Sequence, residues 1–323
     1  MAIKNFGVKD MHTFLLEKKY EVPTYQREFA WTEDELEDFW IDLRNTVDDN
    51  RQIHFLGQVV IHQENDSSPC FLIDGQQRAT TSIIFLAVIR DIMSCYGANQ
   101  YAEPVYMDIK SLYIGRFSPL KNELRLKLGD SNNAFFREHI QTKFEYTKDC
   151  TPSQKRILFA YTYFKERFDE LTKGMDDEQR ILQINLYYET FLHKFTVMSI
   201  TTDEINEAFV IFETLNARGK DLEASDLLKN YVMMQAKNQV DAVQEKWTHM
   251  VDTLVKRDDA TKFIRYYWNS CHGFMQERAL YKTIAMSIDT RNCLQFVDSL
   301  DKAAELYNAM TAPLDNTFLW INR

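Results

Sequence analysis

The 323-residue sequence contains few of the residues that interrupt helices, with only 9 glycines and 6 prolines. This scarcity argues for long helices rather than for β structure with many turns. No apolar run reaches the roughly 18 residues of a membrane-spanning helix, so we expect no membrane partner. The five cysteines include no Cys-x-x-Cys pair. Their number and scatter argue against a zinc site and fit reduced thiols in the cytoplasm.

The common catalytic patterns are also missing. The sequence contains no Gly-x-Ser-x-Gly, no Gly-x-x-x-x-Gly-Lys-Ser/Thr and no Gly-x-Gly-x-x-Gly, which argues against a nucleophile-elbow hydrolase, a P-loop and a dinucleotide fingerprint. The seven histidines lack the spacing of a metal site. A net charge of −10 argues against a general nucleic-acid coat protein and leaves room only for focused contacts to nucleic acid.

The chain is rich in apolar residues, at 45%, and is long enough for one large or two ordinary domains. Its apolar runs predict a hairpin of strands at 54–61 and 70–73, followed by a long helix that ends near residue 96. A short helix is predicted at 8–18, and a capping box at Thr32 and Glu35 begins another.

Beyond this part the pattern becomes helical. Residues 104–128 have room for one or two strands, and 195–200 for an isolated strand. Helices are predicted near 153–173, 176–194, 203–215, 223–238, 241–256, 259–271 and 277–288. We therefore expect an α/β domain over residues 1–100 and a mainly helical domain over 101–323, with a mostly helical chain overall.

The stretch Asp74-Gly75-Gln76-Gln77-Arg78 lies between a predicted strand and the long helix. Such a turn leaves free N–H groups at the positive end of the helix dipole, where phosphate is the usual anion. Gly75 allows close backbone approach, Arg78 can bind a phosphate through two donors, and Asp74 can hold a metal-bound water. The alternative is structural: Asp74 caps the helix, and Arg78 forms a surface ion pair.

Two further groups of polar residues lie outside this turn. Tyr25, Gln26 and Arg27 precede the aromatic residues Phe29 and Trp31, and this loop can stack a base and bind a phosphate. Alternatively, Phe29 and Trp31 are core residues and Arg27 pairs with a carboxylate.

Asn216 and Arg218 form the third group, just before Gly219, which fits a helix end. They are predicted to project from a break between two helices. Alternatively, Asn216 is a helix C-cap and Arg218 is a solvated side chain.

Four blocks follow one another along the sequence. They are Pro23-x-Tyr25-Gln26-Arg27-x-Phe29-x-Trp31, Phe55-Leu56-Gly57, Asp74-Gly75-Gln76-Gln77-Arg78-x-Thr80-Thr81 and Phe212-x-x-Leu215-Asn216-x-Arg218-Gly219-x-x-Leu222. In this order they resemble one bacterial family, the N-terminal domain of GmrSD-type, type IV modification-dependent restriction enzymes and related anti-phage proteins. The resemblance covers roughly residues 8–290. Ala79 departs from it, because leucine is usual at that position.

The resemblance implies a small ParB/sulfiredoxin-like α/β domain followed by a larger helical domain. It also implies a site that binds and hydrolyses nucleoside triphosphates, with Mg²⁺ by analogy, in a system that acts on modified phage DNA. The candidate catalytic residues are then Asp74 (also the metal ligand), Gln76, Gln77 and Arg78. The candidate nucleotide-binding residues are Gly75, Tyr25, Gln26, Arg27, Asn216 and Arg218.

Two main hypotheses follow for function. The first is an NTP-hydrolysing sensor module of a phage-defence system, and the second is a non-hydrolysing module that binds modified DNA. A degenerate scaffold is a third. Full-length relatives carry an HNH-type nuclease domain that this sequence does not resemble, and an apolar pattern continues at 319–321. We therefore expect that the chain is a fragment or a stand-alone subunit and that it partners a nuclease domain or subunit. A homo-oligomer is a further possible assembly.

Overall fold

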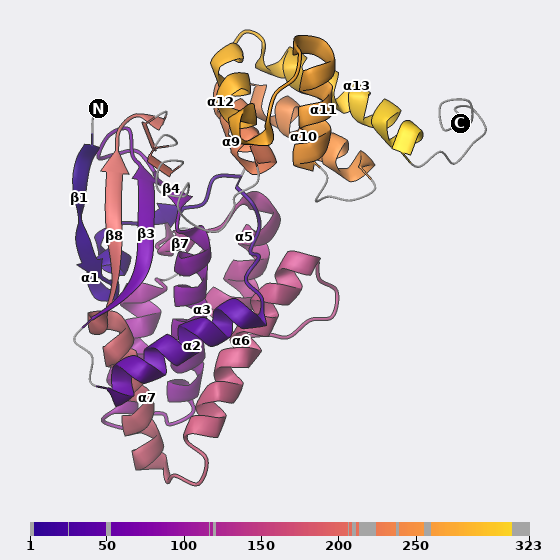
Figure 1. The fold of residues 1–323 in the computed structure, drawn as a ribbon. Helices are drawn as coiled ribbons and strands as arrows, with labels where there is room; N and C mark the ends of the chain where they lie inside the picture. Colours follow the sequence, from indigo (N-terminus) through magenta and orange to yellow (C-terminus); the bar gives the residue numbers. More distant parts are fainter. Residues whose placement is uncertain are drawn as a thin grey trace. The chain divides into compact units, whose positions relative to one another are not determined.

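The structure is a computed structural model of the chain. It describes residues 3–24, 26–49, 53–115, 117–118, 121–205, 207–208, 211–212, 224–236, 239–254 and 260–311. The chain divides into two compact units, Met1–Phe212 and Glu213–Arg323. The first combines a mixed sheet with helices and the second is helical (Figure 1), which confirms the expectation of a mostly helical chain.

A mixed sheet forms one side of the first unit. Among the described residues it has six strands, in the order β1-β8-β3-β4-β2-β7. β1 pairs with β8, and β3 with β4, in antiparallel fashion, whereas the β8–β3, β4–β2 and β2–β7 pairs are parallel. The strands are β1 (Ile3–Asp10), β2 (Tyr20–Glu21), β3 (His54–His62), β4 (Cys70–Asp74), β7 (Leu126–Lys127) and β8 (Phe195–Thr202).

The helix α3 (Gln76–Ser94) is the central helix of the first unit. Residues 83–89 are apolar without interruption, and each is fully buried, as expected of a helix that is hydrophobic on all sides. The phenyl ring of Phe85 lies 5.6 Å from that of Phe39 and 5.0 Å from that of Phe191. It is therefore packed by α2 (Glu33–Asp48) and α7 (Asp177–Lys194), and α6 (Pro152–Leu171) also contacts α3.

Shorter elements complete the first unit. These elements are α1 (Met11–Glu17), α4 (Ala102–Asp108), the π-helical segments η1 (Ile109–Tyr113) and η2 (Arg137–Thr142), β5 (Phe117–Ser118), β6 (Lys121–Asn122) and α5 (Asp130–Phe136). Three of them, α4, η1 and η2, contact α3, and β5 and β6 pair as a separate two-stranded hairpin.

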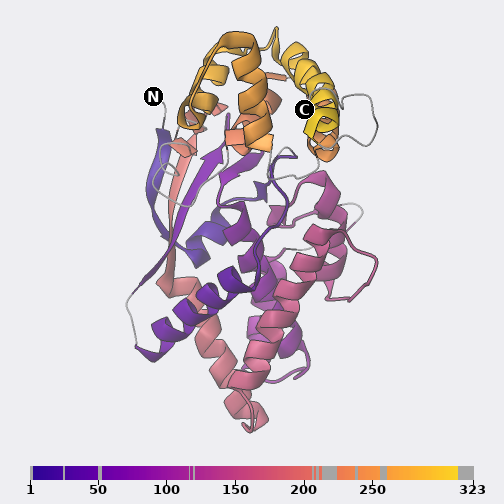
Figure 2. The same ribbon diagram turned by 45° about the vertical axis from the view of Figure 1, so that its right-hand side comes forward.

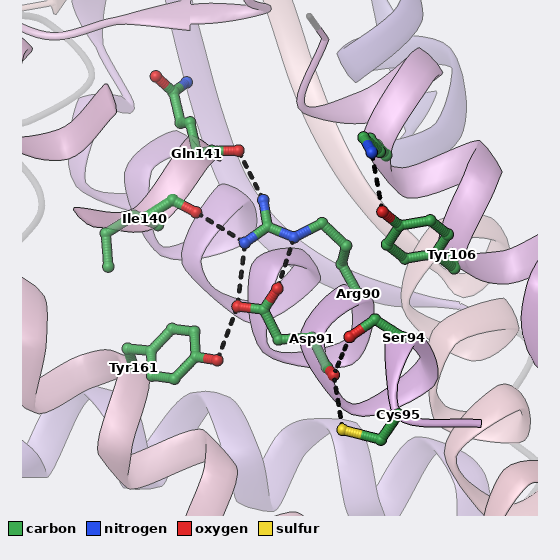
Figure 3. A network of polar contacts seen from close by, with 9 residues as sticks. Arg90, Asp91, Ser94, Cys95, Tyr106, Ile140, Gln141 and Tyr161 are labelled. Carbon is green, nitrogen blue, oxygen red and sulfur yellow. Dashed lines mark hydrogen bonds and ion pairs between the residues drawn. The ribbon is translucent and has the colours of Figure 1, made fainter. Parts of the chain in front are cut away.

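A buried ion pair near the end of α3 joins it to η2 and α6 (Figure 3). Arg90, only 3% exposed, donates to Asp91 and to the backbone oxygens of Ile140 and Gln141, at 2.6–3.0 Å. The hydroxyl of Tyr161 donates to Asp91 at 2.8 Å. Burial, followed by the charge of Asp91, raises the pKa of Tyr161, so this hydroxyl stays protonated and remains a donor.

The second unit consists of helices in its described part (Figure 2). Lys246 lies 2.6 Å from Asp298, and His249 lies 2.7 Å from Asp301, which joins α10 to α13. No helix in the described ranges has the length and apolarity needed to cross a bilayer. The helices are α9 (Ala224–Ala236), α10 (Val240–Thr253), α11 (Ala260–His272), α12 (Glu277–Ser287) and α13 (Cys293–Thr311).

The hairpin of β3 and β4, the long helix α3 and the capping box before α2 confirm the predictions for those segments. The predicted helix at 8–18 is partly wrong, because residues 3–10 form β1 and the helix begins only at Met11. The strand predicted at 195–200 is not isolated, because β8 lies between β1 and β3.

The division between the units also differs from the boundary that we expected near residue 100. β8 belongs to the sheet, and α6 and α7 contribute to the same core as α3. The first unit therefore extends to Phe212. The likeness to a ParB/sulfiredoxin-like domain stays a prediction.

Replacing Arg90 by methionine is expected to lower the free energy of unfolding by about 3–5 kcal/mol, because two backbone carbonyls and Asp91 lose their buried partner. Arg156→Met is the matched control, since Arg156 is an exposed arginine on α6. Urea unfolding of both variants measures the difference. Equal stability of the two would contradict a structural role for the ion pair.

Candidate functional site

The candidate site is the turn between β4 and α3. The backbone of Gly75 has φ +93°, a left-handed conformation that glycine adopts without steric cost. A Cβ atom here would lie 2.9 Å from Cγ2 of Val59 on β3. A residue with a side chain would thus be strained and crowded, so Gly75 is what allows α3 to begin this close to β3.

Arg78 lies on the first turn of α3, facing Asp74. Its Nη2 atom is 3.5 Å from both carboxylate oxygens, and the side chains of Arg78 and Asp74 are 21% and 15% exposed. The pair is therefore not the solvated surface ion pair of the structural alternative. Because 3.5 Å is well beyond the usual N–H···O distance of about 2.9 Å, the pair is loose, and the guanidinium retains donors for another anion.

Gly57 on β3 makes room for this guanidinium. A Cβ atom on Gly57 would lie 2.1 Å from Nη1 of Arg78, and its φ is +131°. The β3–β8 pairing is also irregular between Phe55 and Gly57, as expected of a bulge. The Phe55-Leu56-Gly57 block and the Asp74–Arg78 block thus meet in space, where backbone rather than side chain supports Arg78.

The start of α3 offers backbone donors beside Arg78. The N-cap residue Gly75 has no side chain to accept from the first turn, and its own N–H donates to Oδ1 of Asp74 at 2.7 Å. The first intrahelical bond is made by Ala79, which donates to Gly75 O at 2.9 Å. The N–H groups between them have no intrahelical acceptor. They lie at the positive end of the helix dipole, which favours an anion.

Amide side chains bind residues 26–31, which we term the site loop, to this turn. Nε2 of Gln76 donates to Arg27 O at 3.0 Å, and Nε2 of Gln77 donates to Glu28 O at 3.0 Å. Oε1 of Gln77 accepts from the N–H of Ala30 at 2.8 Å. In return, Nε2 of Gln26 donates to the carbonyl of Ile73 on β4 at 3.0 Å. The site loop and the turn therefore form one rigid unit.

The two glutamines of the turn differ in their spare capacity. Both amide atoms of Gln77 are used by the site loop, so Gln77 is a positioning residue. Oε1 of Gln76 is buried and has no hydrogen-bond donor among the described residues. A buried acceptor without a donor lowers the free energy of unfolding by about 1–3 kcal/mol. Oε1 of Gln76 therefore has unused acceptor capacity among the described residues, and Oε1 of Gln77 is occupied by the Ala30 N–H.

The aromatic residues of the site loop belong to the core. Phe29 is 4% exposed, and its carbonyl accepts from Oγ of Ser153 at 3.2 Å. Trp31 is half-buried and packs on the core. Arg27, between these anchors and the turn, is exposed. The geometry thus supports the core interpretation for Phe29 and Trp31 and leaves the Arg27 side chain accessible to a ligand.

Asp74 is the predicted metal ligand of this site. In the part of the chain that the structure describes, no group of three or more His, Cys, Asp or Glu side chains is arranged to hold a metal ion. Mg²⁺ usually takes one or two carboxylates together with substrate phosphates and water. Asp74 fits that role as a single carboxylate, with phosphates supplying further oxygens.

Three predicted site residues, Tyr25, Asn216 and Arg218, lie outside the described residues. Conversely, the support that Gly57 gives to Arg78 was not predicted. A signal for it exists in the sequence, because a single glycine inside a strand often marks a bulge or a close backbone approach.

Gly57→Ala is expected to displace the guanidinium of Arg78 and to lower stability by about 1–3 kcal/mol, the usual cost of a residue held in an unfavourable backbone conformation. In an Arg78→Ala background the same substitution should cost less, because the steric clash is gone while the backbone strain remains. Urea unfolding of the four proteins of this cycle measures the coupling. Equal costs in both backgrounds would show that Gly57 does not support Arg78.

Gln77→Met should lower the free energy of unfolding by about 1–3 kcal/mol, because Glu28 O and the N–H of Ala30 lose their partner. Gln183→Met is the control, since Gln183 is a half-buried glutamine on another helix, α7. Thermal or urea unfolding compares the two, and an unaffected Gln77→Met protein would contradict the anchoring role.

Comparison with known proteins gives one family. No curated protein matches the chain. The family model described as "GmrSD restriction endonuclease, N-terminal domain" matches residues 10–233, which is more than half of the sequence and includes the site loop, the β3 bulge and the turn after β4. This match confirms the resemblance drawn from the four sequence blocks and relates the protein to restriction endonucleases. The chain therefore belongs to the family of GmrSD restriction endonuclease N-terminal domains.

Proposed function

We propose that the turn between β4 and α3 binds the phosphates of a nucleoside triphosphate and hydrolyses it. In this proposal the chain is the sensor and regulatory module of a phage-defence restriction system that acts on modified DNA. A nuclease domain or subunit carries out the cleavage.

The observation that carries this proposal is the placement of Arg78. Its guanidinium lies over the backbone at Gly57 and beside the uncapped start of α3. A charged, planar donor group and N–H groups without an intrahelical acceptor thus meet at one place, which is the arrangement that binds phosphate oxygens. Arg27, exposed on a loop that is anchored to the same turn, would add a second guanidinium.

Hydrolysis also needs a group that orients the attacking water. Gln76 is better suited to this task than Gln77, because its Oε1 atom lacks a donor. Asp74 would accept a proton from water or hold Mg²⁺, which would neutralise charge on the phosphates when bound. In this scheme Gln77 and Gln26 hold the site loop in place. Gly75 contributes by letting α3 begin close to β3. Tyr25, Asn216 and Arg218 keep their roles as predicted nucleotide-binding residues.

A second function is favoured by one specific observation. Gln77, a predicted catalytic residue, uses both of its polar atoms to hold the site loop. A site with many hydrogen-bond donors for an anion but few catalytic groups fits a module that binds the phosphates of the DNA backbone without hydrolysing a nucleotide. Such binding would weaken steeply with salt and would respond to base modification, with no release of phosphate.

Phosphate release from each of the four ribonucleoside triphosphates, with Mg²⁺ and with or without modified DNA, tests the proposal. Arg78→Ala and Asp74→Asn should each lower turnover by about a hundredfold, the usual loss when a group that stabilises transition-state charge is removed. Arg291→Ala is the control for loss of an arginine, because Arg291 is 90% exposed in the second unit.

Turnover that is unchanged by both substitutions would show that hydrolysis does not take place at this turn. If no nucleotide is hydrolysed under any condition, the NTPase proposal fails. Salt-dependent binding of modified DNA that Arg78→Ala abolishes would then support the non-hydrolysing module.

A further inference from the structure

The carboxylate of Asp74 lies beside the donors that the proposed site offers to phosphate. Its Oδ1 atom accepts from the N–H of Gly75 at 2.7 Å, and both of its oxygens lie 3.5 Å from Nη2 of Arg78. Backbone N–H groups at a helix start and a guanidinium are the donors that an anion uses. Because the side chain of Asp74 is only 15% exposed, water screens its charge incompletely. The turn thus contains a negative charge of its own before a ligand binds.

An incoming anion meets this charge whenever it uses Nη2 of Arg78. A phosphate oxygen that accepts from Nη2 at the usual distance of about 2.9 Å lies within about 6.4 Å of a carboxylate oxygen, the sum of the two distances, whatever its direction of approach. Like charges this close repel each other even when water screens them in part. The N–H groups of Gln76 and Gln77 offer no way around this repulsion, because they follow Gly75 directly in the chain.

We propose that Asp74 makes phosphate binding at this turn depend on a divalent cation. The ligand is then the cation complex of a nucleoside triphosphate, and free nucleotide and inorganic phosphate are rejected. This inference rests on the function proposed above and concerns the selectivity of the same site. Mg²⁺ is commonly held by one or two carboxylates together with substrate phosphates, so it would offset both negative charges when bound. In its absence Asp74 competes with the ligand for the donors.

Gln76 provides a second observation at the same turn. Its side chain is 8% exposed, and its Oε1 atom is buried without a donor among the described residues. The phosphate oxygens of a free nucleotide are acceptors and leave this atom unsatisfied. Mg²⁺ usually retains several water molecules, and water is a donor. A carboxylate that repels bare phosphate and an acceptor that needs a donor therefore favour the same ligand, the hydrated cation complex.

Equilibrium binding of a non-hydrolysable nucleoside triphosphate analogue tests the inference without relying on turnover. Calorimetry with Mg²⁺, and with a chelator in its place, gives the two dissociation constants. The unaltered chain should bind the metal-free analogue about tenfold or more weakly than the Mg²⁺ complex, as expected for one uncompensated like charge at this distance. Asp74→Asn should bind the metal-free analogue about tenfold or more tightly than the unaltered chain does. Asparagine can still accept from the N–H of Gly75, so the turn is retained.

Asp66→Asn is the matched control, because it removes the same charge from an exposed residue between β3 and β4. It should bind the metal-free analogue as the unaltered chain does. Equal affinity of Asp74→Asn and the unaltered chain for the metal-free analogue would overturn the inference. If the unaltered chain binds the analogue equally well with and without Mg²⁺, nucleotide binding stands and the inference fails. If none of the proteins binds either form, the proposed function fails with it.

Inorganic phosphate, which carries no base, gives a second test. Without divalent cations, saturating phosphate should raise the Tm of Asp74→Asn by about 3–6 °C more than that of the unaltered chain or Asp66→Asn, the shift for a tenfold gain in affinity. Adding Arg78→Ala to Asp74→Asn should remove this gain. A shift that is the same in the first three proteins, zero included, or a gain that persists without Arg78, would overturn competition between Asp74 and phosphate.

Discussion

Hydrogen bonds between two glutamine side chains and the backbone of one loop hold the candidate site together. Gln76 and Gln77 occupy the first turn of α3, and their amides bind three backbone groups of the site loop. Because backbone groups are the partners, the loop conformation rather than its side chains is recognised. The backbone of the exposed Arg27 is thereby fixed to the first turn of α3, although the loop and the helix are about 50 residues apart in the sequence.

The core reaches the site through the same loop. Phe29 is buried between the polar residues of the loop, and Ser153 on α6 donates to its carbonyl. The site therefore rests on α3, α6 and β3 together, and each of these elements contributes residues to the core. Rigid elements of this kind hold catalytic or binding groups more precisely than free loops do.

Local patterns predicted the hairpin, α3 and the position of the candidate turn, because each depends on neighbouring residues. β1 was missed because its apolar residues are exposed. Its sequence therefore lacks the regular alternation of apolar and polar residues that a half-buried strand shows. The place of β8 in the sheet depends on pairing with β1 and β3, which no local pattern specifies. Within the site, both partners of Gln77 are backbone groups, a carbonyl and an N–H, and backbone partners have no signature in a sequence. Gly57 alone left a visible signal, as an isolated glycine in a strand.

The place of β8 has a consequence for synthesis of the protein. Thr196 in β8 donates to the carbonyl of His54 in β3, a contact between residues 142 positions apart. The strand that joins β1 to β3 is thus the last one of this sheet to leave the ribosome. Until then β1 and β3 have no neighbour between them, and contacts of such long range slow folding. The nascent chain must therefore carry an unfinished sheet, open to wrong pairings or to chaperones, until Thr202 has emerged.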